Sequence, residues 1–182
     1  MNKKEIEIRF TVSSKQKNMF ANFVKTNKLN IKKSVQRDIY LCPAILVNSK
    51  RSRESNFILR IRQTKKFCYL TYKSFTGDGS WIEREIIINE PLITLEILEK
   101  IGQKKYLTIN KRRQSVKYKT FEINLDDIEG LGDFIEIEVL AENVITAQQD
   151  LINFAKTNFK TTKQSIIKQG YVQLMENNIN NV

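Results

Sequence analysis

The sequence predicts an α+β fold in which about eight antiparallel strands form a sheet or barrel, with helices packed against its apolar side. Segments such as 134–139 alternate strictly, so that Glu136 and Glu138 point to one face while Ile135 and Ile137 point to the other. Long apolar runs, which mark a buried parallel sheet, are missing from these segments. Segments with apolar residues at helical spacing lie between and after the strands and can cover the apolar faces.

Strands are expected where polar and apolar residues alternate between turn signals. In chain order these segments are residues 1–12, 36–43, 56–63, 67–74, 81–89, 104–115, 116–125 and the second half of 125–140. Gly77 and Gly79 mark the turn before the fifth strand, and Gly130 and Gly132 mark the turn before the last. A polar, basic loop is expected over residues 50–55.

Helices are expected over residues 13–26, over residues 91–102 and from about residue 146 onward. Ser13 and Gln16 have the spacing of a capping box at the start of the first helix. In the second, Leu95, Leu98 and Ile101 should form the buried side. The helices therefore have apolar faces that can cover the strands.

Length and composition indicate one globular domain over residues 1–182. Hydrophobic residues make up 41% of the chain, and no linker or internal repeat divides it. No segment approaches the roughly 20 apolar residues of a membrane helix, and the charged N-terminus is unlike a signal peptide. Cys42 and Cys68 do not form a C-x-x-C pair. We therefore expect a cytoplasmic protein with reduced thiols and no membrane attachment.

Like charges lie two residues apart on the polar faces of several strands. The acidic positions are Glu5, Glu7, Glu85, Asp126, Glu136 and Glu138, and the basic positions are Arg9, Arg60, Arg62, Lys73, Arg84, Lys111 and Arg113. One such pair alone usually marks a solvated strand face. If helices cover the apolar faces, however, the charges point inward, where unpaired ions cost several kcal/mol each in typical estimates. A ligand that offsets this cost is then expected.

The chemistry of that ligand follows from the charged residue types. The net charge of +11 calls for an anionic partner, which can be nucleic acid, an anionic membrane surface or a polyphosphate-like small molecule. The chain has no histidine, so a metal ion would be held by carboxylates, which suits Mg²⁺ or Mn²⁺. Carboxylates beside Arg and Lys can together hold a divalent metal and a chain of phosphates.

In their order along the chain, these motifs resemble the CYTH superfamily, also called triphosphate tunnel metalloenzymes. The matching segments are E-I-E-I-R at 5–9, which is similar to the E-x-E-x-K signature, R-I-R at 60–62, L-T-Y-K at 70–73, R-E at 84–85, K-R-R at 111–113 and the run 125–138. Q-x-D-x-Y at 36–40 and G-Y-V-Q-L-M at 170–175 resemble the class IV adenylyl cyclase branch. Arg9 stands where the family usually has Lys, and Ser74-Phe75 stands where Gly-Pro is common.

The resemblance implies a closed or nearly closed eight-stranded antiparallel barrel that binds a triphosphate in its interior. It implies metal carboxylates at Glu5, Glu7, Glu136 and Glu138, to which we add Glu85. It implies phosphate contacts at Arg9, Arg60, Arg62, Lys73, Lys111 and Arg113, to which we add Arg84. Arg9, Lys111 and Asp126 are the candidate catalytic residues.

The function expected from this resemblance is a Mg²⁺- or Mn²⁺-dependent adenylyl cyclase, in which the ribose 3′-hydroxyl of ATP attacks the α-phosphate and pyrophosphate leaves. The alternative is hydrolysis of tripolyphosphate, thiamine triphosphate or a nucleoside triphosphate by the same residues. A second alternative is a non-catalytic binder of RNA or another polyanion. The sequence argues against it, because it contains no helix-turn-helix, no RRM-type aromatic motif and no zinc knuckle. The nucleotide, the preferred metal and a homodimeric state stay open.

Aromatic residues near these motifs have two interpretations each. Tyr40 and Phe134 share the charged faces, so they either contact a nucleoside or pack as ordinary core residues. Tyr171 and Lys168 are candidates to close one mouth of the barrel.

Overall fold

The strands close into an antiparallel barrel, as the sequence predicts. The computed structural model describes residues 3–47 and 57–179. Its strands are β1 (Lys4–Thr11), β2 (Lys32–Pro43), β3 (Phe57–Thr64), β4 (Cys68–Phe75), β5 (Trp81–Ile88), β6 (Gln103–Tyr118), β7 (Phe121–Ile128) and β8 (Gly132–Ala141). They follow the order β1-β5-β4-β3-β2-β6-β7-β8 around the barrel, and β1 closes it by pairing with β8 and β5.

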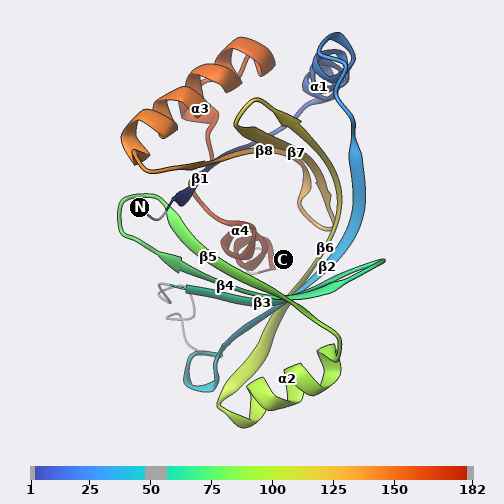
Figure 1. Ribbon diagram of the computed structural model, residues 1–182, viewed down its shortest axis with the longest axis vertical. Helices are drawn as coiled ribbons and strands as arrows, with labels where there is room; N and C mark the ends of the chain where they lie inside the picture. Colours follow the sequence, from blue (N-terminus) through green and yellow to red (C-terminus); the bar gives the residue numbers. More distant parts are fainter. Residues whose placement is uncertain (1–2, 48–56, 180–182) are drawn as a thin grey trace.

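Helices cover the barrel from outside and fill one of its ends (Figure 1). They are α1 (Ser14–Thr26), α2 (Pro91–Lys100), α3 (Val144–Phe159) and α4 (Tyr171–Ile179), with short 3-10 turns at Ala44–Leu46 and Lys163–Ser165. Figure 1 shows α1 and α3 on one side of the barrel, α2 on the opposite side, and α4 in the middle of the ring of strands. None of the described helices is long and apolar enough to cross a membrane.

The capping signals place the helix starts. Ser13 accepts a hydrogen bond from the backbone of Gln16, and the Gln16 side chain accepts one from the backbone of Ser13, so the predicted capping box is confirmed. Asn143 caps α3 by accepting from the backbone N–H of Thr146. This cap starts α3 at Val144, two residues before the expected position.

The main hydrophobic core lies between the barrel wall and the helices α1 and α3. Ile6 and Phe10 of β1 are fully buried there, together with Leu151 and Phe159 of α3. Because strand residues alternate, the charged residues between them point to the opposite side, which is the inside of the barrel. The charged faces thus point into the barrel, as expected, because the helices cover the apolar faces on its outside.

The boundary between β6 and β7 differs from the prediction. The expected division of residues 104–125 lay at Ser115, whereas β6 continues to Tyr118 and the chain turns around Lys119. Lys119 has a left-handed backbone with φ 55°, which residues other than glycine seldom adopt and which no local signal announces. Asp126 consequently lies within β7, whereas the prediction placed it after that strand, just before the turn that leads into β8.

Other expectations need smaller corrections. Ile101 follows the end of α2 and is 69% exposed, so only Leu95 and, in part, Leu98 form the buried side of this helix. β2 begins at Lys32, four residues before the expected start. The basic loop expected over 50–55 lies outside the described residues.

Candidate active site

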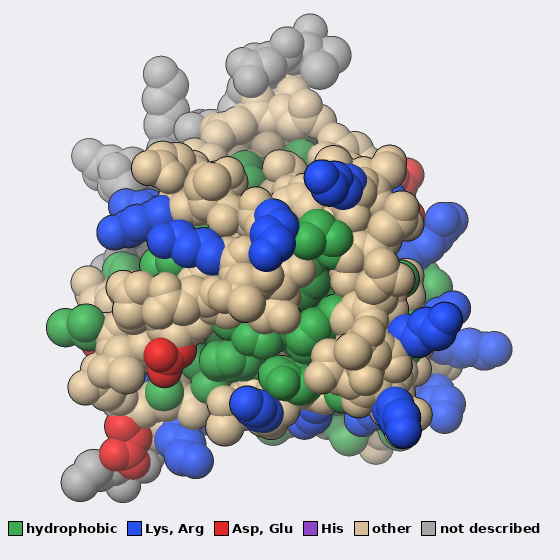
Figure 2. Space-filling view, turned by 90° about the horizontal axis from the view of Figure 1, so that it is seen from above, with side chains coloured by type: hydrophobic (Ala, Val, Ile, Leu, Met, Phe, Trp, Pro, Cys, Tyr) green, Lys and Arg blue, Asp and Glu red, His purple; other side chains and the backbone are tan. Residues whose placement is uncertain are grey.

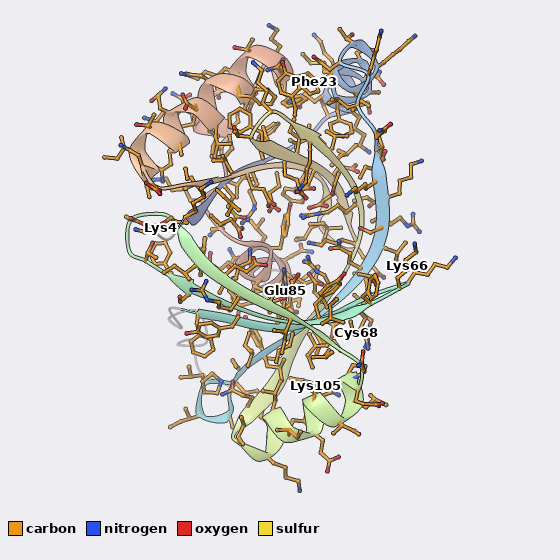
Figure 3. All side chains as sticks on the ribbon, viewed as in Figure 1. Lys4, Phe23, Lys66, Cys68, Glu85 and Lys105 are labelled. Carbon is orange, nitrogen blue, oxygen red and sulfur yellow. The ribbon has the colours of Figure 1, made fainter. Side chains whose placement is uncertain are left out.

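The inside of the barrel is lined by charged side chains (Figure 3), and the buried ones come from β1, β2, β3, β6, β7 and β8. Within the described part of the chain, the residues that are both charged and buried are Glu5, Arg9, Asp38, Arg60, Lys111, Arg113, Asp126 and Glu136. Figure 3 also shows Glu85 on the inner side of β5, whereas Lys66 and Lys105 lie outside the ring. All of these buried positions except Asp38 were predicted as site residues.

Arg113 and Arg9 are held by carboxylates of neighbouring strands. Arg113 donates from Nε and Nη2 to the two carboxylate oxygens of Asp126 at 2.6 Å each, and from Nη2 to Glu136 Oε1 at 2.8 Å. Arg9 donates to Glu136 Oε2 from Nε at 3.1 Å and from Nη2 at 2.9 Å, and it also pairs with Glu7. Burial opposes ionisation of Glu136, but Arg9 and Arg113 outweigh it and hold the pKa of this carboxyl below its usual value.

Asp38 is the centre of a second group of cations on β2, β3 and β6. Arg62 donates to both of its oxygens at 2.7 Å, while Arg60 and Lys111 approach to 3.6 and 3.7 Å. Burial opposes the charge of Asp38, yet the Arg62 hydrogen bonds and the nearby Lys111 and Arg60 hold its pKa well below the ordinary value. The alternation of polar residues over 36–40 was the signal that could have identified this carboxylate.

Lys111 is the buried cation with the weakest hold on its proton. Burial, together with the positive charges of Arg113 and Arg62, lowers its pKa to about 7 even though Asp38 lies nearby. Its ammonium nitrogen also lies 5.4 Å from the centre of the Tyr171 ring. Lys111 can therefore exist in both protonation states near neutral pH.

Three carboxylates form a group that can hold a metal ion. Oxygens of Glu5, Glu7 and Glu138 lie within 4.8 Å of one another. Burial and the neighbouring carboxylates raise the pKa of Glu138 to about 8, and burial and Glu7 raise the pKa of Glu5 to about 7 despite Lys73 at 2.7 Å. Their negative charge is only partly offset by neighbouring cations, and carboxylate oxygens are the ligands that Mg²⁺ and Mn²⁺ prefer. The three carboxylates therefore fit either metal.

Two predicted metal carboxylates lie outside this group. Glu136 is occupied by Arg9 and Arg113, so its oxygens are already paired. Glu85 accepts from Thr71 at 2.8 Å and lies 4.0 Å from Arg60, on the part of the wall formed by β3–β5.

Arg84 was wrongly placed among the phosphate contacts. Strand alternation turns it to the outer face of β5, where it is exposed and donates to the backbone oxygen of Glu83. The neighbouring Glu83, which was not predicted as a site residue, points inward and pairs with Lys73 at 2.5 Å.

α4 closes one end of the barrel through contacts with the charged residues. The Tyr171 hydroxyl donates to Asp126 Oδ2 at 3.0 Å, and the Arg9 guanidinium lies 4.7 Å from the Tyr171 ring centre. Arg9 also donates from Nη1 to the backbone oxygen of Gln169 at 2.8 Å. Tyr40 and Phe134 pack in one apolar cluster with Tyr171, which favours their interpretation as packing residues, while Lys168 is exposed.

The chain is similar in sequence or in structure to several known proteins. A Methanocaldococcus jannaschii protein, whose name reads "putative adenylate cyclase", is 29% identical over 176 residues, which cover 93% of this chain and 97% of that protein. A solved structure from Vibrio parahaemolyticus, named as that of a "putative adenylate cyclase", has a TM-score of 0.78 at 16% identity and covers 97% of this chain and 99% of its own.

A second solved structure, from Hippeastrum, has a TM-score of 0.62 at 19% identity, covering 86% of this chain and 87% of that chain. That protein is described as a "putative adenylyl cyclase" with a dominant triphosphatase activity. Both structures share the barrel fold. The family model described as the CYTH domain matches residues 3–171, and this chain therefore belongs to the CYTH domain family.

Proposed function

We propose that this chain is a divalent-metal-dependent enzyme that acts on a triphosphate inside the barrel, converting ATP to cyclic AMP and pyrophosphate. One observation carries the proposal: three arginines and one lysine are buried inside the barrel, and beside them lie the carboxylates of Glu5, Glu7 and Glu138, two of which have a raised pKa. A triphosphate with a divalent metal brings the complementary charges in a single ligand.

The metal would be held by Glu5, Glu7 and Glu138. When bound there, Mg²⁺ or Mn²⁺ would supply a positive charge that polarises phosphoryl oxygens. Lys73, which already contacts Glu5 and Glu83, lies at the border between the carboxylates and the phosphate-binding cations.

The phosphate chain would be bound by the inward cations Arg9, Arg60, Arg62, Lys73, Lys111 and Arg113. In the free protein, Asp38, Asp126 and Glu136 hold five of these side chains in place through the ion pairs described above. Cations held in position can offset the charge that builds on the leaving pyrophosphate without rearranging. Asp126 thus acts through Arg113, whose two donors it orients.

In the cyclisation, the O3′–Pα bond forms and the bond from Pα to the oxygen bridging to the β-phosphate breaks, so that pyrophosphate leaves. As the O3′–Pα bond forms, the 3′-hydroxyl loses its proton to solvent. Lys111, whose pKa burial lowers to about 7 in the free protein, becomes fully charged when the triphosphate binds, because the phosphates favour its protonated form. Arg9, fully charged and fixed by Glu136, would stabilise the reacting phosphates.

Hydrolysis of the triphosphate is the second candidate, and one observation favours it. Tyr40 and Phe134, the aromatic residues that could stack on a base, are packed in the cluster with Tyr171. Water would then attack Pγ within the same group of cations, the bond from Pγ to the oxygen bridging to the β-phosphate would break, and ADP and phosphate would leave. The name of the M. jannaschii relative supports the first candidate, and the activity stated for the Hippeastrum protein supports the second. A non-catalytic polyanion binder would gain nothing from the three inward carboxylates.

Product analysis tests the proposal. The protein is incubated with ATP and Mg²⁺ or Mn²⁺, and cyclic AMP with pyrophosphate is resolved from ADP with phosphate. We expect cyclic AMP and complete loss of turnover with EDTA. ADP and phosphate would select hydrolysis instead, and unchanged turnover in chelator, or no turnover of either ATP or tripolyphosphate, would contradict the proposal.

A further inference from the structure

Asn124 is a fully buried, uncharged residue on the inner wall of the barrel, on β7. In the antiparallel register it lies opposite Glu136 of β8 on one side and opposite Ser115 of β6 on the other. The Ser115 hydroxyl donates to Asn124 Oδ1 at 2.5 Å and so fixes the orientation of the amide. The other amide atom, Nδ2, is buried without a hydrogen-bond partner among the described residues.

An unused donor at this place needs an explanation, because a buried N–H without an acceptor is costly. The carboxylates nearest along the strands are already engaged. Glu136 accepts from Arg113 on one oxygen and from Arg9 on the other, and Asp126 accepts from Arg113 and Tyr171. No hydrogen bond joins Nδ2 to Glu122 or Glu138 either, so this donor is available to an acceptor on a bound ligand.

The position of Asn124 identifies the chemistry of that acceptor. Along β8, Glu138 of the metal group follows two residues after Glu136, and along β6, Arg113 precedes Ser115 by two residues. In the register, Asn124 therefore lies between the position opposite Glu138 and the position opposite Arg113, so a ligand that binds at both of these lies beside it. Since the walls on both sides bind a metal and phosphates in the proposed function, the oxygen beside Asn124 is a phosphoryl oxygen.

We propose that Asn124 is a triphosphate-positioning residue whose Nδ2–H donates to a phosphoryl oxygen between the metal group and Arg113. This inference rests on the proposed function and adds a neutral contact to the charged ones. A neutral donor orients the phosphate chain without adding to its long-range attraction, so its contribution is nearly independent of salt, unlike that of a cation.

The test measures binding of tripolyphosphate with Mg²⁺ by calorimetry, at low and at high salt, to the wild type and to three variants. Asn124→Ala removes the donor, and Asn124→Asp replaces it by an oxygen while keeping the shape and the acceptor for Ser115. Asn110→Ala is the matched control, because Asn110 is an exposed amide on β6 that donates to Glu129 at 2.9 Å. Circular dichroism melts establish that each variant folds.

We expect affinity to fall roughly three- to ten-fold in Asn124→Ala, by a similar factor at both salt concentrations, and further in Asn124→Asp. Asn110→Ala should bind like the wild type. If Asn124→Ala does not fold, the near-isosteric Asn124→Asp carries the test. Wild-type affinity in Asn124→Asp would overturn this inference and leave the proposed function intact. A loss of affinity in Asn110→Ala equal to that in Asn124→Ala would do the same. No binding by the wild type would overturn both.

Discussion

Arg60 and Arg84 differ in the strand face that they occupy, and this decides what each can contact. Arg60 is buried inside the barrel beside Asp38 and Thr71, whereas Arg84 is exposed on the outer face. At the scale of single residues, the inner position also decides ionisation. Arg60 stays charged beside Asp38, while burial, together with Arg113 and Arg62, lowers the pKa of Lys111 although Asp38 lies nearby.

Arg60→Ala is expected to weaken ATP binding about ten- to a hundred-fold and AMP binding far less, because an inward guanidinium meets β- or γ-phosphate oxygens that AMP lacks. Arg60→Lys should recover part of the loss, since it keeps the charge but not the planar fork. Arg84→Ala is the matched control and should bind like the wild type. Calorimetric titrations with both nucleotides check this, and equal ATP affinity in Arg60→Ala and Arg84→Ala would contradict it.

Lys111 makes stability depend on pH. Its folded pKa of about 7 lies below the ordinary 10.5, so between these values the unfolded state binds more protons and stability rises with pH. Below pH 7 the lysine is charged in both states, and its full burial cost applies. Lys111→Met should therefore stabilise the free protein most below pH 7 and lose this advantage toward pH 10. Urea unfolding across this range measures it, and a pH-independent difference would count against the lowered pKa.

Glu138→Gln is expected to weaken Mg²⁺ binding at least about ten-fold, because it removes one of three oxygen ligands. It should leave the metal-free protein stable at pH 7, where a carboxyl with a pKa of about 8 is mostly neutral and a Gln amide resembles it. Melting curves with and without Mg²⁺ test both statements. Glu96→Gln, on the exposed side of α2, is the control, and an equal Mg²⁺-induced shift in both variants would contradict the assignment of the metal group.

At the scale of elements, local signals determined where helices begin, and non-local packing determined where they lie. The capping box of α1 is formed by two side chains and two backbone groups three residues apart. The position of α4 inside the barrel end depends instead on Tyr171 reaching Asp126 of β7 and Arg9 of β1. The sequence of α4 alone does not predict these contacts.

Ser13→Ala is expected to destabilise the protein by about 1 kcal/mol, because it removes the hydroxyl that accepts from the Gln16 backbone N–H. Ser14→Ala should change the free energy of unfolding little, since Ser14 is exposed in the first turn and alanine favours helices. Urea unfolding of both variants measures the difference. Equal effects of the two substitutions would show that the capping box adds nothing.

At the scale of the whole molecule, the net charge of +11 comes from outside the barrel, because the charged residues buried in the described interior are four cations and four carboxylates. The interior combines cations with carboxylates in close pairs. On the face that carries α1 and α3, Figure 2 shows Lys and Arg side chains spread around an apolar middle, with few acidic ones. Exposed charges of this kind attract polyanions at long range and lose that attraction in salt.

The two surfaces predict different responses to RNA and ATP. Weak RNA binding through the outer lysines and arginines should fall steeply with salt and stay unchanged in Arg60→Ala. ATP binding should be weakened about ten- to a hundred-fold in that variant at both low and high salt. Fluorescence titration with a short RNA, in parallel with ATP calorimetry, tests this. Loss of RNA affinity in Arg60→Ala with normal ATP binding would favour a nucleic-acid-binding surface over a triphosphate site.

The sequence by itself determined which side of each strand is charged and which is apolar. Alternation is a local property with a period of two residues, so Glu5, Arg9, Lys111 and Glu136 could be assigned to the charged faces before any strand was paired. The expected helices, which cover the apolar faces, indicated that the charged faces point inward. The motif order also predicted the closed antiparallel barrel and the family. The error at Ser115 arose because a turn at a left-handed lysine leaves no local signal.

Only the tertiary structure decided which inward charges meet. Glu136 and Glu138 are indistinguishable by pattern, yet Arg9 and Arg113 reach Glu136 from β1 and β6, while Glu138 meets Glu5 and Glu7. Such pairs depend on strand order, register and side-chain reach, which connect residues far apart along the chain. For the same reason Asp38 emerged as a centre of charge, and Asn124 as an unused donor, only once the barrel had closed.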